Sequence, residues 1–195
     1  SELGEASAAV GDSPAARYVR SWASKGRSLI GNVETRLLLL DSGAHQFPVS
    51  VNNGESHGGN CYVVSPLAAY GAYAQEEVNR MKMRRLRLPF SWLAGAVTSL
   101  FRSIQADRVV FINNWLLSTN LYPAAWKGDD LPEITQLMRT TYPRHVFAFR
   151  SLNSHCNGPL IARLKALGYV SIPSRQVYIF DGRAGDEAAF RTHHN

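Results

Sequence analysis

The sequence lacks an apolar run long enough to cross a bilayer, and it lacks the glycine-rich motifs of the common nucleotide-binding folds. A spanning helix needs about 20 consecutive apolar residues. The longest apolar stretch, 90–104, is interrupted by serine, glycine, threonine and arginine. Its amphipathic pattern predicts a helix that packs in a core. Walker A and GxGxxG motifs are also absent, which argues against P-loop NTPases and Rossmann dinucleotide binding.

Cysteine is scarce as well. The chain of 195 residues holds 2 cysteines, Cys61 and Cys156, and neither has the CxxC or Cys/His spacing of a zinc site. We therefore predict no metal. Small oxidised domains usually carry several disulfides, and the sequence shows no signal peptide. Both observations favour a reducing compartment, so we expect a cytoplasmic location and no membrane span.

The charge is unbalanced toward the basic side. A net charge of +6 is compatible with nucleic acid, phosphate-bearing ligands or acidic substrates. Much of the excess lies in residues 80–87, RMKMRRLR. One interpretation is a solvated helix end, where the helix dipole favours cations. The other is a contact with RNA, made by Lys82, Arg84, Arg85 and Arg87.

The first half of the chain predicts an arm followed by short elements. Residues 1–30 lack a clear apolar period and predict a flexible N-terminal arm with a short helix over 15–24. Residues 31–195 predict a single α/β domain. Pro48 favours an edge position or a bulge for the strand that contains it. The expected elements are strands at 34–41, 45–52 and 61–64, a helix that begins at Ser65-Pro66, and a helix that begins near Ser91.

The second half predicts a strand–helix–strand unit. Strands at 108–113 and 145–149 enclose a helix in which Asp130 resembles the cap of a capping box. Such units are usually parallel and right-handed. The fold class predicted for the domain is therefore α/β, with a mixed, largely antiparallel sheet and a central parallel βαβ unit flanked by helices.

Three more elements are expected at the C-terminal end. A helix capped by Ser154 or Asn157 is ended by Gly168 in the left-handed conformation. Two strands, at 169–172 and 176–180, follow it on either side of Pro173-Ser174.

Polar residues follow both strands of the predicted βαβ unit. If the strands are parallel neighbours, these residues emerge at one sheet edge, which is where α/β proteins bind ligands. They are Asn113, Asn114 and Ser118 after the first strand, and Ser151, Asn153 and Asn157 after the second. Two interpretations stay open: the side chains line a binding site, or they cap loop backbone groups and bind nothing.

The C-terminal part of the chain resembles the closing part of a GNAT-type acyltransferase. The matching features are the strand VFAFRSLN, Asn157 near the start of the following helix, the step Leu167-Gly168-Tyr169 and two final strands. The resemblance covers about residues 108–181. The chain differs from the family at residues 113–120, NNWLLSTN, where GNAT enzymes carry a glycine turn that holds the pyrophosphate of CoA. A GNAT-like domain that lacks this turn resembles the domains of Fem-type aminoacyl transferases. It also resembles those of related acyltransferases that are built from two GNAT-like halves.

The resemblance implies a transferase that moves an acyl or aminoacyl group to an amine, with acyl-CoA as one donor. It implies that Asn113, Asn114 and Ser118 orient substrate, and that Ser151 and Asn153 contact donor or acceptor. An amine must lose a proton before it attacks, and the candidate bases are Glu76, His155 and His57. The alternatives are a GNAT-like domain that binds a ligand without catalysis and a basic RNA-contacting module. The oligomeric state is left open.

Overall fold

The computed structural model describes residues 2–4, 12–54, 60–72 and 84–174. By its internal contacts the chain divides into two compact units, 1–152 and 153–195, and each is described by itself. No helix in the described part of the chain is long and apolar enough to cross a membrane.

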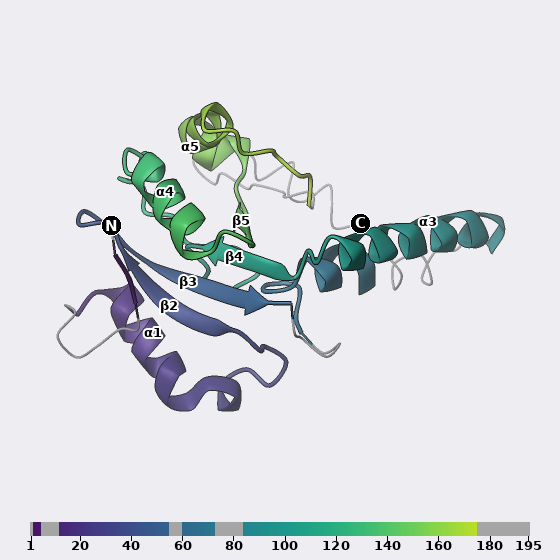
Figure 1. Cartoon of the computed structure of the whole chain (residues 1–195), viewed down its shortest axis with the longest axis horizontal. Coiled ribbons are helices and arrows are strands. Elements are labelled where there is room, and N and C mark those ends of the chain that lie inside the picture. The colour runs from purple at the N-terminus through teal and green to yellow at the C-terminus, as the bar shows by residue number, and fades with distance from the viewer. Residues whose placement is uncertain (1, 5–11, 55–59, 73–83, 175–195) are drawn as a thin grey trace, which may run out of the picture. The chain divides into compact units, whose positions relative to one another are not determined.

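The first unit is built on a five-stranded sheet whose strands lie in sequence order (Figure 1). Neighbouring strands are antiparallel except for the last pair, which is parallel. The expected mixed α/β sheet is therefore confirmed, but the parallel pair lies at one end of the described sheet and not at its centre. The strands are β1 (Glu2–Gly4), β2 (Arg36–Asp41), β3 (Gln46–Asn53), β4 (Arg108–Ile112) and β5 (Val146–Phe149).

The strands predicted at 34–41 and 45–52 are confirmed as the antiparallel pair β2 and β3, but β3 is not an edge strand. It pairs with β2 on one side and with β4 on the other. Pro48 fits in β3 because it lies one residue outside the ladder between β3 and β4, which ends at the pair Val49–Ile112. One residue further on, the Pro48 carbonyl accepts a hydrogen bond from the backbone N–H of Asn114 at 2.7 Å, so no ladder bond requires the N–H that proline lacks.

Helix α1 (Pro14–Lys25) covers one face of the sheet along β2 and β3 (Figure 1). Its inward residues recur at helical spacing and pack with Leu37 and Leu39. They are Ala15, Ala16, Val19 and Trp22. The short helix expected over 15–24 is thus confirmed. Within the expected arm, α1 packs on the sheet and β1 is one of its strands. A one-turn helix, η1 (Gly26–Ser28), follows it.

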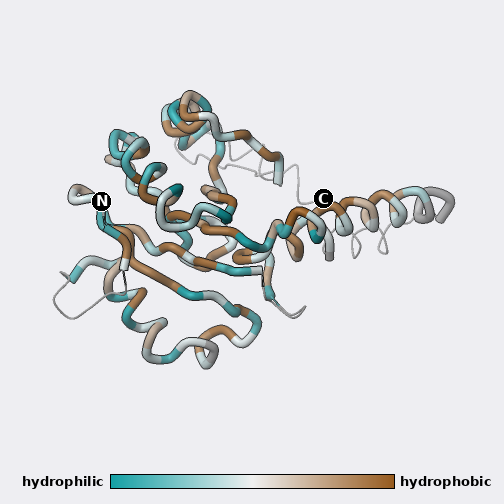
Figure 2. Tube along the Cα trace, in the orientation of Figure 1, coloured by the Kyte–Doolittle hydropathy of each residue, from teal (hydrophilic) through white to brown (hydrophobic). Residues whose placement is uncertain are grey.

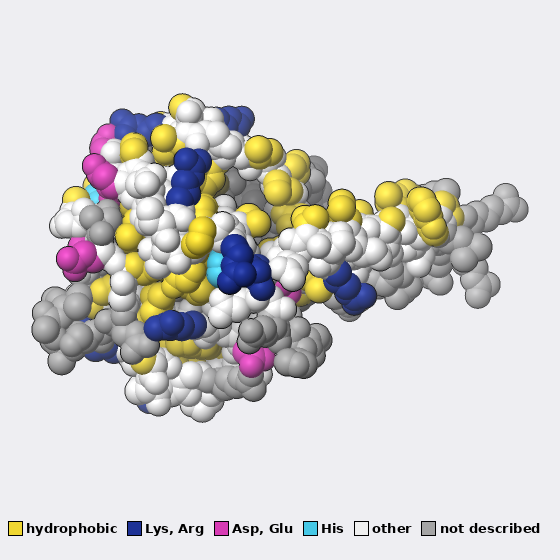
Figure 3. All heavy atoms as spheres, viewed as in Figure 1, with side chains coloured by type: hydrophobic (Ala, Val, Ile, Leu, Met, Phe, Trp, Pro, Cys, Tyr) yellow, Lys and Arg dark blue, Asp and Glu magenta, His cyan; other side chains and the backbone are white. Residues whose placement is uncertain are grey.

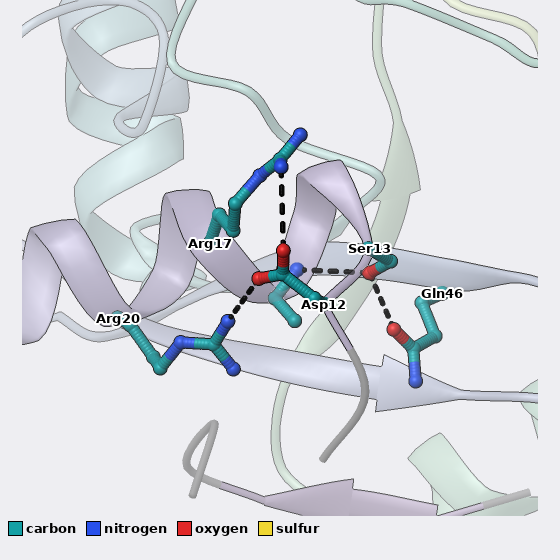
Figure 4. Close-up of polar contacts among 6 residues, drawn as sticks. Asp12, Ser13, Arg17, Arg20 and Gln46 are labelled. Carbon is teal, nitrogen blue, oxygen red and sulfur yellow. Dashed lines mark hydrogen bonds and ion pairs between the residues drawn. The ribbon is translucent and has the colours of Figure 1, made fainter. Parts of the chain in front are cut away.

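The start of α1 is fixed by its cap (Figure 4). The hydroxyl of Ser13 accepts from the backbone N–H of Ala16 at 3.1 Å and donates to Gln46 of β3. Asp12 accepts from Arg17 and Arg20 at 3.4 and 2.9 Å. Since Asp12 is largely exposed, these ion pairs add little. The Ser13 cap contributes more to the stability of the helix, because it satisfies an otherwise unpaired backbone N–H.

Helix α4 (Leu131–Thr141) lies on the other face (Figure 1). Leu131, Ile134 and Met138 are completely buried, and Trp126 packs on Phe47 and Phe149 at ring-centroid distances of 4.7 and 6.1 Å. The capping box predicted at Asp130 is wrong, because the side chain makes no cap bond. Its Oδ1 accepts from the indole N–H of Trp126 at 2.6 Å.

Two expectations between β3 and β4 need correction. The strand expected at 61–64 is a turn closed by Val64 N–H to Cys61 O at 3.0 Å. The helix predicted to begin at Ser65-Pro66 is confirmed, with Ser65 Oγ accepting from Ala68 N–H at 2.9 Å, and it continues as a π-helical turn, η2 (Ala68–Ala72). Helix α3 (Arg84–Ser103) begins before the expected Ser91. It packs on η2, with Tyr70 against Phe101 at 5.6 Å. Figure 2 shows hydrophobic residues recurring along α3, and Phe90, Trp92, Leu93 and Leu100 are exposed.

In the second unit the structure describes α5 (Ser154–Ala166) and the segment after it. The cap is Asn153, whose side chain accepts from the backbone N–H of Cys156 at 2.8 Å. Neither expected residue, Ser154 or Asn157, serves as the cap. Gly168 has a φ of 88° and ends the helix as predicted. Residues 169–172 do not form the expected strand, and 176–180 lie outside the described residues.

Candidate functional site at the ends of the parallel strands

The chain leaves β4 and β5 in the same way. The residue shortly after each strand has a positive φ, 57° at Asn113 and 60° at Ser151, in the left-handed region where asparagine is among the favoured non-glycine residues. Because β4 and β5 are parallel and in register from Val109–Val146 to Ile112–Phe149, both exits lie at one edge of the sheet. The two loops therefore emerge together, as the sequence predicted, and they meet where Ser151 Oγ donates to Ser118 O and Arg150 Nη1 donates to Asn114 Oδ1.

Asn114 is fully buried, and its amide is saturated by the protein. Its Nδ2 donates to Ser50 Oγ at 2.7 Å and to Val63 O at 2.9 Å. Its Oδ1 accepts from the N–H of Leu116 at 3.2 Å and from Arg150 Nη1 at 3.0 Å. These four bonds use the two donors and two acceptor sites of the side chain. They favour a structural role, because contact with a ligand requires one of them to break.

Asn113 is fully buried too. It donates to the carbonyl of Leu121 at 2.9 Å and accepts from the indole N–H of Trp115 at 2.9 Å. Trp115 in turn packs on Tyr18 of α1 at 5.3 Å, and the Tyr18 hydroxyl donates to Trp115 O at 2.7 Å. Burial raises the pKa of Tyr18 to about 12. The loop after β4 is therefore held by its own amides and by α1.

Arg150 is the cation at this edge, and it was not among the residues predicted for the site. Its guanidinium lies 5.6 Å from the ring centroid of Phe111 and joins the loop through Asn114. A second, longer contact runs to the carbonyl of Leu117 at 3.5 Å. The sequence position of Arg150 could have indicated this role. A charged residue directly after a buried strand needs polar partners or a ligand.

Two hydroxyls close the same edge. Tyr122 donates to the carbonyl of Arg150 at 2.7 Å. Burial raises the pKa of its phenol well above the usual range, against the opposing effects of the Asn120 amide and the Arg150 charge. Ser151 Oγ donates to the carbonyl of Ser118 at 3.2 Å. Ser118 itself is exposed. Its hydroxyl is therefore better placed for a ligand than the amide of either asparagine.

The remaining predicted site residues lie in the second unit or outside the described residues. Asn153 and Asn157 lie at the start of α5, where Asn157 Oδ1 accepts from the N–H of Asn153 at 3.3 Å. His155 is exposed on the first turn of that helix. Glu76 and His57 lie outside the described residues, so their predicted role as a base stays a prediction. Both cysteines are free thiols.

A serine motif and metal ligation are two further chemical possibilities. Residues 54–58 have the G-x-S-x-G spacing of a nucleophile elbow, which was missed in the sequence. They follow β3, which is antiparallel to both its neighbours, whereas that motif requires a strand–turn–helix context; residues 55–59 lie outside the described residues. Within the described ranges no group of three His, Cys, Asp or Glu residues is arranged to hold a metal ion.

Comparison of the chain with protein-family models, with curated proteins and with solved structures found no match. The site is therefore interpreted from its own chemistry. A cation, an exposed hydroxyl and two loops that leave adjacent parallel strands are suited to hold a small anionic or carbonyl group.

Proposed function

We propose that the chain is a GNAT-like domain of a transferase that moves an acyl or aminoacyl group to an amine. The observation that carries this proposal is the parallel β4–β5 pair at the end of an otherwise antiparallel sheet. Both strands end at one edge, beside Arg150. This arrangement agrees with the strand–helix–strand part of the GNAT-like pattern, although the strand that the pattern places at 169–172 is not formed.

Arg150 would hold the anionic or carbonyl part of the donor. Guanidinium groups bind carboxylate and phosphate through charge-assisted hydrogen bonds. The loop after β4 fits the usual CoA pyrophosphate turn poorly, because it has no glycine between 113 and 120. Two of its backbone N–H groups, those of Asn114 and Leu116, already donate within the protein. The donor contact proposed here therefore rests on Arg150 and Ser118 and not on a backbone cradle.

The reaction would be an ordinary acyl transfer. The neutral amine attacks the carbonyl carbon of the donor, a C–N bond forms, and the bond to the leaving group breaks. The proton lost by the amine passes to a base or water, and the leaving thiolate or alkoxide takes up a proton. Glu76 and His155 stay the candidates for the base.

A transfer assay tests the proposal. The full chain is incubated with acetyl-CoA, or with an aminoacyl-tRNA, and a panel of primary amines, and the amines are followed by mass spectrometry. We expect an acylated amine and an equal amount of released CoA or tRNA. Arg150→Gln should lower the rate at least about tenfold, whereas Arg139→Gln, at an exposed position on α4, should leave it unchanged. No product from any donor would contradict the proposal.

The saturated amides of Asn113 and Asn114 favour a second candidate, a GNAT-like domain that binds a ligand without catalysis. In that case donor binding depends on Arg150 while no acylated amine forms. The transfer assay and a binding titration on the same protein separate the two functions.

A further inference from the structure

Helix α3 exposes a continuous apolar stripe. Its apolar residues recur at the spacing 3, 4, 3, 4, which places them on one side of a helix. They are Phe90, Leu93, Val97, Leu100 and Ile104, the last of which directly follows the helix. Four of the five are exposed, and Leu93, Leu100 and Ile104 keep 52%, 56% and 60% of their surface in solvent. Figure 3 shows hydrophobic side chains in a row along one edge of α3.

Among the described residues, the stripe is not the side of α3 that packs inward. The side of α3 that packs inward carries Ala94, Thr98 and Phe101. Ala94 is buried, Thr98 meets Gly71, and Phe101 meets Tyr70. The stripe lies beside this packed side, and Trp92, next to Leu93, is 76% exposed. An exposed row of large apolar residues on a helix marks a surface that binds a partner or a membrane.

The charge of this region indicates which kind of partner. Between residues 78 and 106 there is no acidic residue, while six residues are basic: Arg80, Lys82, Arg84, Arg85, Arg87 and Arg102. In the rest of the chain 15 basic and 15 acidic residues balance. The whole net charge of +6 is therefore concentrated in the segment that carries the apolar stripe.

This combination selects among the partners. A second copy of the same helix would bring two acid-free basic segments together, which is unfavourable. A single-stranded nucleic acid would use the cations and stack on Trp92, but it would leave four aliphatic side chains of the stripe without a role. An anionic lipid surface uses both features, since its headgroups attract lysine and arginine and its acyl boundary takes up apolar side chains.

We propose that α3 is an interfacial helix that binds the surface of an anionic lipid bilayer. The stripe from Phe90 to Ile104 enters the boundary between headgroups and acyl chains, and the six positive charges of residues 78–106 add attraction to an anionic surface. Trp92 is the kind of residue that is enriched at this depth. Residues 84–103 form about 30 Å of helix, so α3 lies along the surface.

Vesicle flotation tests this inference. The full chain is mixed with vesicles of phosphatidylcholine, or of an equimolar mixture of phosphatidylcholine and phosphatidylglycerol. We expect flotation with the anionic vesicles only, and less of it as salt is raised. Leu93→Gln combined with Leu100→Gln should lower the partition coefficient at least about tenfold. The matched control combines Leu29→Gln with Val170→Gln, two exposed apolar positions outside α3, and should float like the unaltered chain.

A charge series separates lipid from nucleic acid. Arg84→Gln, Arg85→Gln and Arg87→Gln together should abolish most of the flotation. The matched control changes three exposed cations elsewhere, Lys25, Arg139 and Lys165, to Gln. The same proteins are titrated with poly-uridine RNA. Absence of flotation with anionic vesicles overturns the proposal, as does flotation that the leucine variant leaves unchanged. RNA binding that needs the arginines, without vesicle binding, would identify the other partner.

Depth of insertion gives a second readout that does not depend on these variants. Brominated lipid should quench the fluorescence of the unaltered chain more than that of Trp92→Phe, since the other three tryptophans are not on α3. Equal quenching of both proteins would contradict insertion of α3. Far-UV circular dichroism and the thermal midpoint confirm that each variant is folded.

Discussion

Arg150 at the end of β5 donates from Nη1 to Oδ1 of Asn114 after β4, at 3.0 Å. This bond joins the ends of the two parallel strands. The same asparagine also binds Ser50 and Val63, so one buried amide connects four segments of the chain. The candidate site is consequently built on this hydrogen-bond network, which includes Arg150, and Ser118 adds an exposed hydroxyl beside it.

Replacing Asn114 should destabilise the fold. Asn114→Ala leaves the hydroxyl of Ser50 and the carbonyl of Val63 without their partner, and we expect a loss of about 2–4 kcal/mol in the free energy of unfolding. Ser118→Ala, at an exposed position, should cost less than about 0.5 kcal/mol. Urea denaturation measures both. A loss at Asn114 as small as that at Ser118 would show that the amide is not structural.

The start of the η2 helix should depend on a second buried pair. Ser65 Oγ accepts from the N–H of Ala68 at 2.9 Å and donates to the carboxylate of Asp107 at 2.8 Å, which also accepts from the N–H of Leu67 at 2.9 Å. We expect Ser65→Ala to cost about 1–2 kcal/mol and Asp107→Ala a similar amount. Because the two share one network, the double variant should cost less than the sum. Strict additivity in chemical denaturation would contradict this network.

Stability should fall as His145 becomes protonated. Burial lowers the pKa of His145 from its usual 6.5, and the charges of Arg108 and Arg144 lower it further. Its Nε2 lies 3.0 Å from Asn53 Oδ1, and its buried Nδ1 has no hydrogen-bond partner among the described residues. A lowered pKa means that the unfolded chain takes up the proton first as the pH falls.

The contribution of His145 is therefore complete above about pH 6.5 and is lost as the pH falls from there through the folded pKa. His145→Gln should flatten the decline in thermal midpoint over that window, whereas His155→Gln, at an exposed position, should not. Parallel pH profiles for the unaltered chain and His145→Gln would exclude this role.

Close packing between η2 and α3 should be sensitive to a single methyl group. A Cβ at Gly71 would lie 2.9 Å from Oγ1 and 3.5 Å from Cγ2 of Thr98. We expect Gly71→Ala to cost about 1–3 kcal/mol, and Thr98→Ala in the same chain to restore most of it. Differential scanning calorimetry of the single and double variants tests the contact. A double variant no more stable than Gly71→Ala alone would show that the strain does not arise from the contact with Thr98.

Much of the sheet could be predicted because its signals are local. Alternating apolar residues and the Ser42-Gly43 turn specify the β2–β3 hairpin, and Gly168 ends α5 as its sequence context requires. The run at 61–64 was misread, because a short apolar segment has the same composition whether it pairs as a strand or fills a core as a turn. Val64 is completely buried within such a turn.

At the site the sequence left two interpretations open, and at α3 it predicted core packing that the structure does not show; both outcomes have a different cause. The roles of Asn113 and Asn114 depend on partners such as Ser50, 64 residues away in sequence, which no local pattern reveals. For the stretch 90–104 the amphipathic pattern predicted the helix correctly. It did not specify whether the apolar side would meet a core or solvent, and the structure leaves Leu93 and Leu100 exposed.

The most direct test of the proposed transferase is a calorimetric titration of acetyl-CoA, and separately of an aminoacyl-tRNA, into the full chain, Arg150→Gln, Arg150→Lys and Arg139→Gln. We predict that the unaltered chain and Arg139→Gln bind one of these donors alike. Arg150→Gln should bind it at least about tenfold more weakly, with Arg150→Lys between them. No binding heat with either donor, or equal affinity for Arg150→Gln and the unaltered chain, would contradict a donor site at the ends of β4 and β5.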